Sequence, residues 1–465
     1  MASQQTRPAR GMRDFLPEDV RRREYVIGVI SEVYRRYGFE PLETPALENI
    51  ETLTGKYGEE GSALIFKVLR RGERESSGET DLALRYDLTV PLARVVAEYR
   101  AKLPKFFKRF QIQPVWRADR PARGRFREFF QCDVDAIGSR SMVVEAELCS
   151  AVCDVLLALG FDNFVIKLNH RGVLDGLLNA SGVAPDLRAS ALTALDKMDK
   201  IGPDGVQREL EERGILTPRL TAAISELTAL NQGVHPRDVA NGLATARLNQ
   251  LLEGDESAVL GVRQLQEILE LSQHTSAKDR IQLDASLARG LSYYTGAIME
   301  VAVPDLAGSL GGGGRYDGLI GMFLGENVPA CGFSLGLERI LVVMGERDMF
   351  PSSVERSAAD VLVTLFDEAT VPEALRLAAE LRDAGVRVEV YPEPDKLGKQ
   401  MKYAAAGRVP FAAILGSDEI ARGEVTVKNL GAGVQSSVPR VALAQRLRDW
   451  LAEPGVPNPE SRTET

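Results

Sequence analysis

Residues 106–135 read FFKRFQIQPVWRADRPARGRFREFFQCDVD, and the fold can be inferred outward from this stretch. Two apolar segments flank a loop that contains proline and glycine, a pattern that predicts a strand, a loop and a second strand. Such a loop would direct Arg117 and Arg125 into one cleft. The alternative interpretation is a solvated basic hairpin. Surface charge runs seldom include aromatic side chains that can stack on a base, and three are present here: Phe126, Phe129 and Phe130.

The same stretch concentrates positive charge in a chain whose formal net charge is -9. That overall charge argues against a protein that coats polyanions generally. Guanidinium groups bind phosphates through paired donors, so we expect a local polyanion site. Hydrogen-bond acceptors follow the loop, and which of them face the cleft stays open at this point. Counted from Lys105, just before this stretch, to Arg127, the eight basic residues are Lys105, Lys108, Arg109, Arg117, Arg120, Arg123, Arg125 and Arg127, interrupted by one acid, Asp119; the acceptors are Glu128, Gln131, Asp133 and Asp135.

A second informative segment is LARGLSYYTG at residues 287–296. Its arginine, Arg289, stands next to a glycine and can therefore approach a phosphate closely. Tyr293 and Tyr294 can offer aromatic walls and hydroxyl groups to a small polar ligand. These residue types suit an amino acid that is being joined to a nucleotide. The alternative is an ordinary hairpin with aromatic packing.

Two glycine-rich segments follow. GSLGGGGRYDG at residues 308–318 lacks the Gly-Lys-Ser/Thr ending of a Walker loop and does not match the dinucleotide-binding spacing. It favours a strand whose backbone a ligand can approach closely. CGFSLGLERI at residues 331–340 predicts a strand that turns into a helix, with Arg339 placed to meet a phosphate.

Composition limits the class of protein. At 465 residues the chain exceeds what one hydrophobic core usually supports, so two or three domains are expected. No apolar run approaches the roughly 20 residues of a membrane span, and the first residues lack a signal-peptide core, so we expect a cytoplasmic protein. Four scattered cysteines predict reduced thiols. Cys149 and Cys153 lie one helical turn apart, but no second Cys or His pair follows at zinc spacing, and no metal site is assigned.

The pattern of apolar residues changes along the chain. Residues 18–38 predict an amphipathic helix, and the prolines of residues 39–45 then suit an edge strand or an extended segment. Later, helical spacing with few aromatic residues indicates a helical insertion, and near the end short apolar strands alternate with helical patterns. The expected parts are a first catalytic segment at residues 1–172, a helical insertion at 173–275, a second catalytic segment at 276–346, a linker at 347–358 and an α/β domain with a disordered tail at 359–465.

Taken in order, these segments resemble the histidyl-tRNA synthetases, a family of class II aminoacyl-tRNA synthetases. The resemblance covers nearly the whole chain. Its most specific parts are residues 287–296 and 312–318, which resemble the two histidine-specific motifs. Residues 10–17 resemble the amino-terminal signature, the first helix with residues 41–45 the first class II motif, residues 117–135 the second, residues 332–339 the third, and residues 397–406 and 423–429 the anticodon-binding domain.

The resemblance implies an α+β fold, in which an antiparallel class II sheet with flanking helices carries a helical insertion and a C-terminal α/β anticodon-binding domain. It implies that histidine and ATP give histidyl-adenylate and pyrophosphate, and that the histidyl group then passes to the 3' end of histidine tRNA. ATP would be a substrate accompanied by Mg²⁺. A homodimer and no contact with membranes are expected.

The resemblance also implies roles for individual residues. Arg117 and Arg289 would hold the α-phosphate and act as the catalytic residues, because fixed guanidinium donors stabilise charge that develops on phosphorus oxygens. The remaining ATP-binding residues would be Asp119, Arg125, Phe129 and Arg339, with Phe129 stacked on adenine and Arg125 and Arg339 on the outer phosphates. Histidine would be bound by Asp87, Thr89 and Gln131 at its amino group, by Asp135 and Tyr294 at its imidazole, and by Arg289 and Tyr293 nearby.

The sequence departs from the family pattern in two places. Ser292 stands where the histidine motif commonly carries aspartate, which removes a charge near the expected pocket. RYDLT at residues 85–89 replaces the Pro-Glu-Gly-Thr form of many bacterial members, although it still presents an acid and a threonine.

Two other functions stay open at this point. One is a regulatory paralogue of histidine biosynthesis, which has a similar catalytic fold but lacks the anticodon domain; the residues after Asp360 argue against it. The other is a non-catalytic tRNA-binding or sensor protein, which would be expected to have lost the phosphate-binding arginines.

Overall fold

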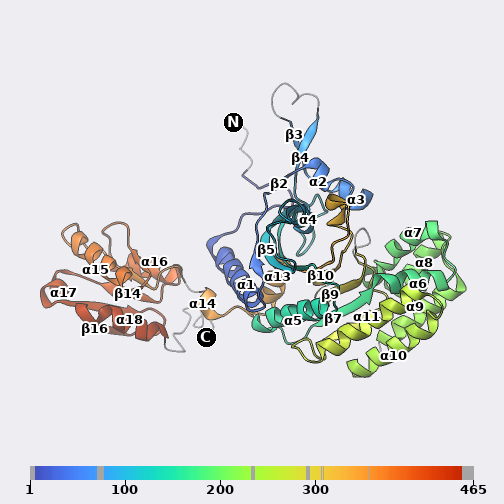
Figure 1. Ribbon diagram of the computed structural model, residues 1–465. Coiled ribbons are helices and arrows are strands. Elements are labelled where there is room, and N and C mark those ends of the chain that lie inside the picture. Colours follow the sequence, from blue (N-terminus) through green and yellow to red (C-terminus); the bar gives the residue numbers. More distant parts are fainter. Residues whose placement is uncertain are drawn as a thin grey trace. The chain divides into compact units, whose positions relative to one another are not determined.

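The structure is a computed structural model that describes residues 6–70, 78–231, 236–289, 294–304, 306, 308–355 and 357–452. The chain divides into two compact units, with the boundary between Met349 and Phe350. The first unit contains two sheets and the second contains one (Figure 1). Each unit also has hydrophobic core clusters of its own. The domain boundaries inside the first unit stay a prediction.

The first unit is built on an eight-stranded sheet whose strand order is β1-β5-β6-β11-β10-β9-β7-β8. Neighbouring strands are antiparallel from β5 to β7, whereas β1 pairs with β5 and β8 pairs with β7 in parallel. The expected antiparallel sheet is therefore confirmed for the central strands. Their bounds are β1 Glu40–Pro41, β5 Phe107–Trp116, β6 Glu128–Ile137, β7 Val165–His170, β8 Ile281–Leu283, β9 Ala297–Ala302, β10 Ser309–Arg315 and β11 Ala330–Gly336.

Helix α1 (Pro17–Arg36) confirms the predicted amphipathic helix. Proline at its first position and acids in its first turn suit the positive end of the helix dipole, and the helix ends before Gly38, which has a φ of 75°. Its apolar stripe is buried against α5 (Val143–Ala158) and α13 (Leu337–Glu346). The segment after it enters the edge strand β1, as its prolines predicted.

A smaller antiparallel sheet with the strand order β2-β4-β3 lies near one rim of the first unit. Short helices and α4 accompany it, and α4 begins at Thr89. The segments after α3 and β4 contact the end of β5 and the start of the loop between β5 and β6, where Ala118 N–H donates to the carbonyl oxygen of Leu64 and Trp116 N–H to that of Arg85. The bounds are β2 Leu47–Asn49, α2 Ile50–Leu53, α3 Gly58–Ala63, β3 Lys67–Leu69, β4 Thr80–Leu84, α4 Thr89–Glu98 and α12 Gly321–Leu324.

The predicted helical insertion is confirmed as a run of helices between β7 and β8. Leucine and alanine side chains give it a buried cluster of its own, to which Leu287 and Ile298 of the sheet region contribute. Helix α11 packs against α5 and α6 and so joins the insertion to the sheet. The helices are α6 Arg171–Ala180, η2 Pro185–Leu187, α7 Arg188–Leu195, α8 Met198–Glu212, α9 Pro218–Asn231, α10 Arg237–Leu251 and α11 Glu256–Ser272.

The second unit is an α/β domain with a five-stranded sheet in the order β13-β12-β14-β15-β16. The first three strands are parallel, whereas β15 and β16 are antiparallel. The predicted alternation of short strands with helices is confirmed; β16, whose side chains are mostly exposed, was not predicted. The bounds are α14 Ser352–Glu355, β12 Val361–Val363, α15 Val371–Asp383, β13 Val388–Val390, α16 Leu397–Ala406, β14 Phe411–Ile414, α17 Ser417–Arg422, β15 Glu424–Asn429, β16 Gln435–Pro439, η3 Arg440–Ala442 and α18 Leu443–Ala452.

The cysteines and the helices agree with the expectations from composition. All four cysteines are buried free thiols. Within the part of the chain that the structure describes, no helix combines the length and the apolar character that a membrane crossing requires.

Candidate active site

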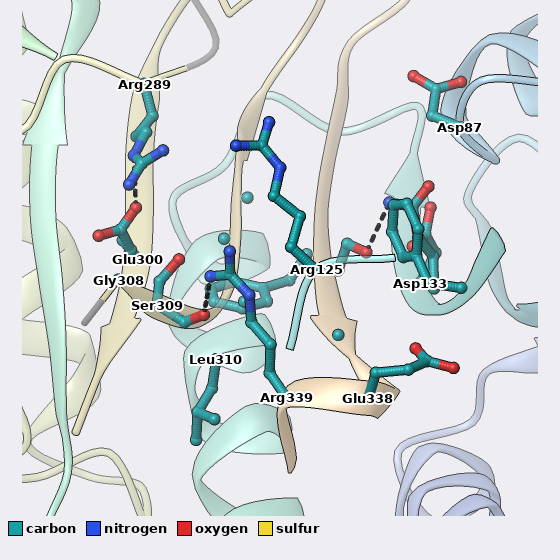
Figure 2. Close-up of a pocket in the computed structure, with 18 of the residues that line it drawn as sticks. Asp87, Arg125, Asp133, Arg289, Glu300, Gly308, Ser309, Leu310, Glu338 and Arg339 are labelled. Carbon is teal, nitrogen blue, oxygen red and sulfur yellow. Dashed lines mark hydrogen bonds and ion pairs between the residues drawn. The ribbon is translucent and has the colours of Figure 1, made fainter. Parts of the chain in front are cut away.

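One cavity of about 780 Å³ opens over the central strands of the large sheet. Its walls come from the loop between β5 and β6, from β6, β10 and β11, and from the start of α13. Figure 2 shows Arg289, Arg125 and Arg339 on one side of it and Asp87 and Asp133 on the other. The cavity is therefore electrically divided, with a cationic end and an anionic end.

Four of the arginines that line the cavity form its cationic end: Arg117 and Arg125 from the loop between β5 and β6, Arg289 before β9, and Arg339 of α13. The side chain of Arg117 donates from Nε to the carbonyl oxygen of Tyr86 at 2.9 Å, and its guanidinium lies 4.2 Å from the Tyr86 ring centre and 5.2 Å from that of Phe129. Arg125 pairs with Asp119 at 2.7 Å. Both contacts hold a guanidinium in place while leaving further N–H donors available.

The other two arginines come from the second half of the first unit. Arg289 pairs through Nε with Glu300 at 2.6 Å, and Arg339 donates to the carbonyl oxygen of Ser309 (Figure 2). Burial lowers the pKa of Arg339, and the neighbouring charge of Arg289, then that of Arg125, lower it further. Cations that repel one another in this way gain free energy when a polyanion binds between them.

Glu338 fixes the helix that carries Arg339. One of its carboxylate oxygens pairs with Arg23 of α1 at 2.8 Å, and the other accepts the backbone N–H of Phe130 at 3.0 Å. Both side chains of the ion pair are buried. The start of α13 is thereby tied to α1 and to β6, which gives Arg339 a fixed origin at the cavity wall.

The anionic end contains three buried carboxylates. Asp87 accepts hydrogen bonds from the Tyr57 hydroxyl at 2.9 Å and from a backbone N–H at the start of α4. Asp133 and Asp135 project from β6, and Asp135 also accepts a hydrogen bond from the hydroxyl of Tyr316. Gln131, on the same face of β6, donates to Ser334 at 2.9 Å.

Burial shifts the ionisation of these acids. It raises the pKa of Asp133 to about 7, with the charge of Asp135 adding to the shift and Arg109 opposing it. Burial also raises the pKa values of Asp135 and Asp87. A cation that binds among the three carboxylates restores their ionised forms, so this end of the cavity favours an ammonium group or an imidazole N–H donor.

Glycines allow the strands at the cavity floor to lie close to one another. A Cβ atom at Gly311 would collide with the carbonyl oxygen of Ser334, and one at Gly313 would collide with that of Gly332. A Cβ atom at Gly332 would overlap the Asp135 carboxylate itself, its cross-strand neighbour. The glycine-rich segment is thus the predicted strand, β10, and its lack of side chains has a steric cause.

We expect Gly332→Ala to displace the Asp135 carboxylate and to lower the affinity of this end of the cavity for an amino acid by about tenfold, the effect of losing one good hydrogen bond. Gly318→Ala is the matched control, because a Cβ atom there meets nothing within 4 Å. Isothermal titration with histidine, the amino acid that the family resemblance implies, measures both variants. Equal affinities for the two would contradict this steric argument.

Most residues predicted for the site lie together in the cavity, and their roles remain proposals. Tyr293 and Ser292 lie outside the described residues. Of the acceptors left open by the sequence, Glu128 is exposed and does not line the cavity. The predicted residues that line it are Asp87, Thr89, Arg117, Asp119, Arg125, Phe129, Gln131, Asp135, Arg289, Tyr294 and Arg339.

The eight basic residues of this stretch divide between the cavity and other surroundings, and the two that were expected to face one cleft, Arg117 and Arg125, both line it. Arg109 is fully buried, and it pairs with Asp135 at 2.9 Å. Lys108 pairs with Glu147 at 2.8 Å, and Arg127 donates to the backbone of Asp119. A strand alternates the faces of its residues and cross-strand pairing decides their partners, so local charge counting cannot distinguish these residues from those lining the cavity. The basic residues that do line it from this stretch are Arg117, Arg123 and Arg125.

The three phenylalanines divide in the same way. Phe126 and Phe129 line the cavity, whereas Phe130 lies on the other face of β6, with its ring centre 4.7 Å from the guanidinium carbon of Arg23. Sequence reasoning missed Tyr316, Glu300 and Glu338 as cavity residues. The only sign of these residues in the sequence was that polar side chains interrupt segments with an apolar strand or helix pattern.

Comparison with known proteins agrees with this geometry. A family model described as Histidyl-tRNA synthetase matches residues 11–340, and one described as Anticodon binding domain matches residues 360–450. The chain belongs to the histidyl-tRNA synthetase family. A relative from Gloeobacter violaceus, Histidine--tRNA ligase, is 43% identical over 95% of this chain and 98% of its own length. The protein of the same name from Christiangramia forsetii is 40% identical over 94% of this chain and 98% of its own.

Solved structures also resemble this histidyl-tRNA synthetase family member. The crystal structure of histidyl-tRNA synthetase from Nostoc sp. PCC 7120 has a TM-score of 0.82 at 30% identity and covers 96% of this chain and 100% of its own. A structure titled ATP phosphoribosyltransferase regulatory subunit/histidyl-tRNA synthetase, from Bacillus halodurans C, has a TM-score of 0.69 at 22% identity, covering 86% of this chain and 96% of its own. The latter likeness concerns the fold alone.

Proposed function

We propose that this chain is a histidine–tRNA ligase, which activates histidine with ATP to histidyl-adenylate and then transfers the histidyl group to the 3' end of histidine tRNA. The observation that carries the proposal is the divided cavity. Its cationic end suits the phosphates of ATP, its anionic end suits the amino and imidazole groups of histidine, and the two substrates would meet between them. Family membership and the matched anticodon-binding domain agree with both steps.

The arginines would act on the phosphates. In the adenylation step the carboxylate of histidine attacks the α-phosphorus, charge develops on its equatorial oxygens, and pyrophosphate leaves. Arg117 and Arg289, held by Tyr86 and Glu300, would stabilise that charge without reorganising. Arg125 and Arg339 would hold the outer phosphates. Each arginine would bind phosphate oxygens through the guanidinium N–H groups that are not used in its contact with the protein.

The other proposed contacts with the nucleotide involve residues that lie beside these arginines in the cavity. Phe129, which already lies beside the Arg117 guanidinium, would stack on adenine. Asp119 would orient Arg125 through their ion pair. Mg²⁺ would enter with ATP, because this ion is commonly held by substrate phosphates and one or two carboxylates. Among the described residues, no group of three or more His, Cys, Asp or Glu side chains has an arrangement that could hold a metal ion by itself.

The acids and their neighbours would bind histidine. Asp87, Thr89 and Gln131 would receive the amino group, and Asp135 with Tyr294 the imidazole. The sequence assigns Tyr293 and Arg289 to the same pocket. A carboxylate that accepts from a ring N–H discriminates strongly against amino acids that lack the donor, because the buried acceptor would then stay unpaired.

Asp135→Ala is expected to raise the KM for histidine by about 10- to 100-fold, the cost of losing a hydrogen bond to a charged group, while the KM for ATP stays nearly unchanged. Steady-state pyrophosphate exchange measures both constants. The Asp135→Asn variant, which keeps the volume, serves as the control for packing. A similar loss toward both substrates would assign Asp135 a structural role instead.

The second unit would bind the tRNA. It contributes no described residue to the cavity, and tRNA recognition at unstacked loop bases needs a surface away from the acceptor end. The proposal also includes a homodimer and a cytoplasmic location, which accord with the family. The basic residues of this unit that would contact phosphates include Lys396, Lys399, Lys402, Arg408, Arg422 and Lys428.

ATP–pyrophosphate exchange with each of the amino acids in turn, followed by charging of histidine tRNA, tests the proposal. Exchange with histidine alone and formation of histidyl-tRNA are expected. Exchange without charging would favour a regulatory paralogue, and binding of tRNA with neither reaction would favour a non-catalytic tRNA-binding protein.

A further inference from the structure

Arg109 lies directly behind the anionic end of the cavity. It stands on β5 opposite Asp135 of β6, and its Nη2 atom is 2.9 Å from Asp135 Oδ2 and 3.9 Å from Asp133 Oδ2. The same nitrogen donates to the carbonyl oxygen of Leu88, immediately before α4, at 3.3 Å. Arg109 is fully buried and does not line the cavity, so it acts on a ligand through its neighbours: the two aspartates, and Leu88, which lies between the cavity residues Asp87 and Thr89.

Polar atoms without hydrogen-bond partners gather around this pair. Among the described residues, buried side-chain atoms of this kind include the Nε and Nη1 atoms of Arg109 and Asp133 Oδ1. Asp135 Oδ2 has its ion pair with Arg109 but no aligned hydrogen bond. The neighbours Gln111 and Gln131 add one oxygen each. Buried polar groups without partners cost free energy, and such clusters are often completed by a ligand or ordered water. Asp133 and Asp135 line the cavity, which places the incomplete cluster where a substrate can reach it.

Arg109 supplies positive charge beside a group of buried carboxylates. Three buried carboxylates, those of Asp87, Asp133 and Asp135, share this region with the one buried guanidinium of Arg109. Like charges at short range cannot all stay ionised unless a cation compensates them. Arg109 is the largest opposing influence on the raised pKa values of both Asp133 and Asp135. Other titratable groups that act on the two aspartates or on Asp87 are Tyr34 of α1, Tyr57, Arg117, Cys132, Tyr316 and Cys331.

We infer that Arg109 is a positioning residue for histidine activation, whose guanidinium holds Asp133 and Asp135 as oriented anions, and that Asp133 is a further acid through which the site binds the amino acid. Without Arg109, one carboxylate takes up a proton and becomes a donor where the substrate also presents a donor. The inference rests on the proposed function, because the substrate is taken to be histidine. It adds to that function a residue outside the cavity and an acid within it.

The test compares wild type with Arg109→Met, Asp133→Asn and the double variant that combines them. Arg109→Met removes the cation, Asp133→Asn removes one acid, and the double variant restores the wild-type charge of the cluster. Histidine-dependent ATP–pyrophosphate exchange is followed from pH 6 to 9, and kcat/KM for histidine is expressed relative to wild type at each pH. This ratio cancels the titration of histidine itself.

Removing an opposite charge typically raises a carboxyl pKa by about one unit or more. On the acid side of the pH profile, kcat/KM for histidine falls as a carboxylate becomes protonated. In Arg109→Met this fall should therefore occur about one pH unit higher than in wild type. At pH 7 the kcat/KM of the variant should be about tenfold lower, and it should recover toward pH 9. In Asp133→Asn the same fall in kcat/KM should occur at a lower pH than in wild type. In the double variant the fall in kcat/KM should return to the pH at which it occurs in wild type. Arg109→Lys, which keeps a positive charge, should lose less kcat/KM than Arg109→Met. The KM for ATP should stay unchanged throughout.

Urea unfolding over the same pH range gives a readout that does not depend on activity. An acid whose pKa is raised by folding contributes stability that is present at low pH and lost as the pH rises through the folded-state value. Arg109→Met should therefore lose stability relative to wild type as the pH rises, and Asp133→Asn should gain it.

Ratios for Arg109→Met that are independent of pH, or a double variant no better than the single variant, would overturn the inference while leaving the proposed function intact. Absence of histidine-dependent exchange in wild type would overturn the proposed function itself. The unfolding profiles would then still decide whether Arg109 controls the ionisation of the aspartates.

Discussion

Arg289→Ala is expected to lower the rate of histidine-dependent ATP–pyrophosphate exchange by about 10²- to 10³-fold, the typical cost of removing one preorganised donor to developing charge. The side chain lies at the cationic end of the cavity, where Glu300 fixes its Nε atom at 2.6 Å. Because the lost interaction strengthens only as the transition state forms, kcat should fall far more than the apparent affinity for ATP or histidine changes. Single-turnover formation of the adenylate measures this directly.

Arg123→Ala is the matched control for Arg289→Ala. Arg123 also borders the cavity, but its half-exposed side chain pairs with the similarly exposed Glu346. An exposed ion pair of this kind contributes little, so exchange should change by less than about fivefold. Near-normal exchange in a folded Arg289→Ala protein would remove Arg289 from the catalytic residues. Equal losses in the two variants would indicate a general effect of positive charge rather than a fixed donor.

A protein that ends near residue 356 is expected to keep histidine activation and to lose most charging of histidine tRNA. The chain divides just before this point, and the second unit has a separate core formed by its own strands and helices. The cavity residues all precede it. Loss of a remote tRNA-binding surface removes binding free energy from the transfer step without altering the chemistry of the first step.

The shortened protein must first have the same oligomeric state as the full chain, which sedimentation or light scattering establishes. Charging kinetics with histidine tRNA then give kcat/KM for both proteins. If the shortened dimer charges the tRNA with unchanged kcat/KM, the second unit has no role in tRNA binding, and the regulatory-paralogue interpretation regains support.

Local patterns predicted the elements of this fold where one face of a helix or strand is buried. The apolar stripe of α1 and the strand–loop–strand unit around Arg117 are of this kind. The outer strand β16 has one buried residue, Val438, and so little pattern to detect. A strand is recognisable from its sequence when packing requires an alternation of side chains, and an exposed edge strand has no such requirement.

In the candidate site, too, some residues could be predicted from local sequence and others could not. Its arginines were predicted because each stands in a short segment with a local signal, either a run of basic and aromatic residues or a nearby glycine. The pairing of Arg109 with Asp135 was not, because it depends on the register between β5 and β6. The buried contact of Arg315 with Glu145, a bidentate pair at 2.6 and 2.8 Å, joins residues 170 positions apart and was missed for the same reason. Register is decided by the whole sheet, so residues that are remote in sequence become partners only in the fold.

The glycine floor of the cavity limits how this protein could be redesigned for an unnatural amino acid. At Gly311 and Gly313 even a methyl group would strike the backbone of β11, so no substitution there can reshape the pocket without moving a central strand of the sheet. Enlarging the pocket would have to start from the side chains that face it from other walls, such as Gln131 and Tyr294. A variant library directed at those walls would therefore sample new specificities, whereas one directed at the floor would mostly yield misfolded protein.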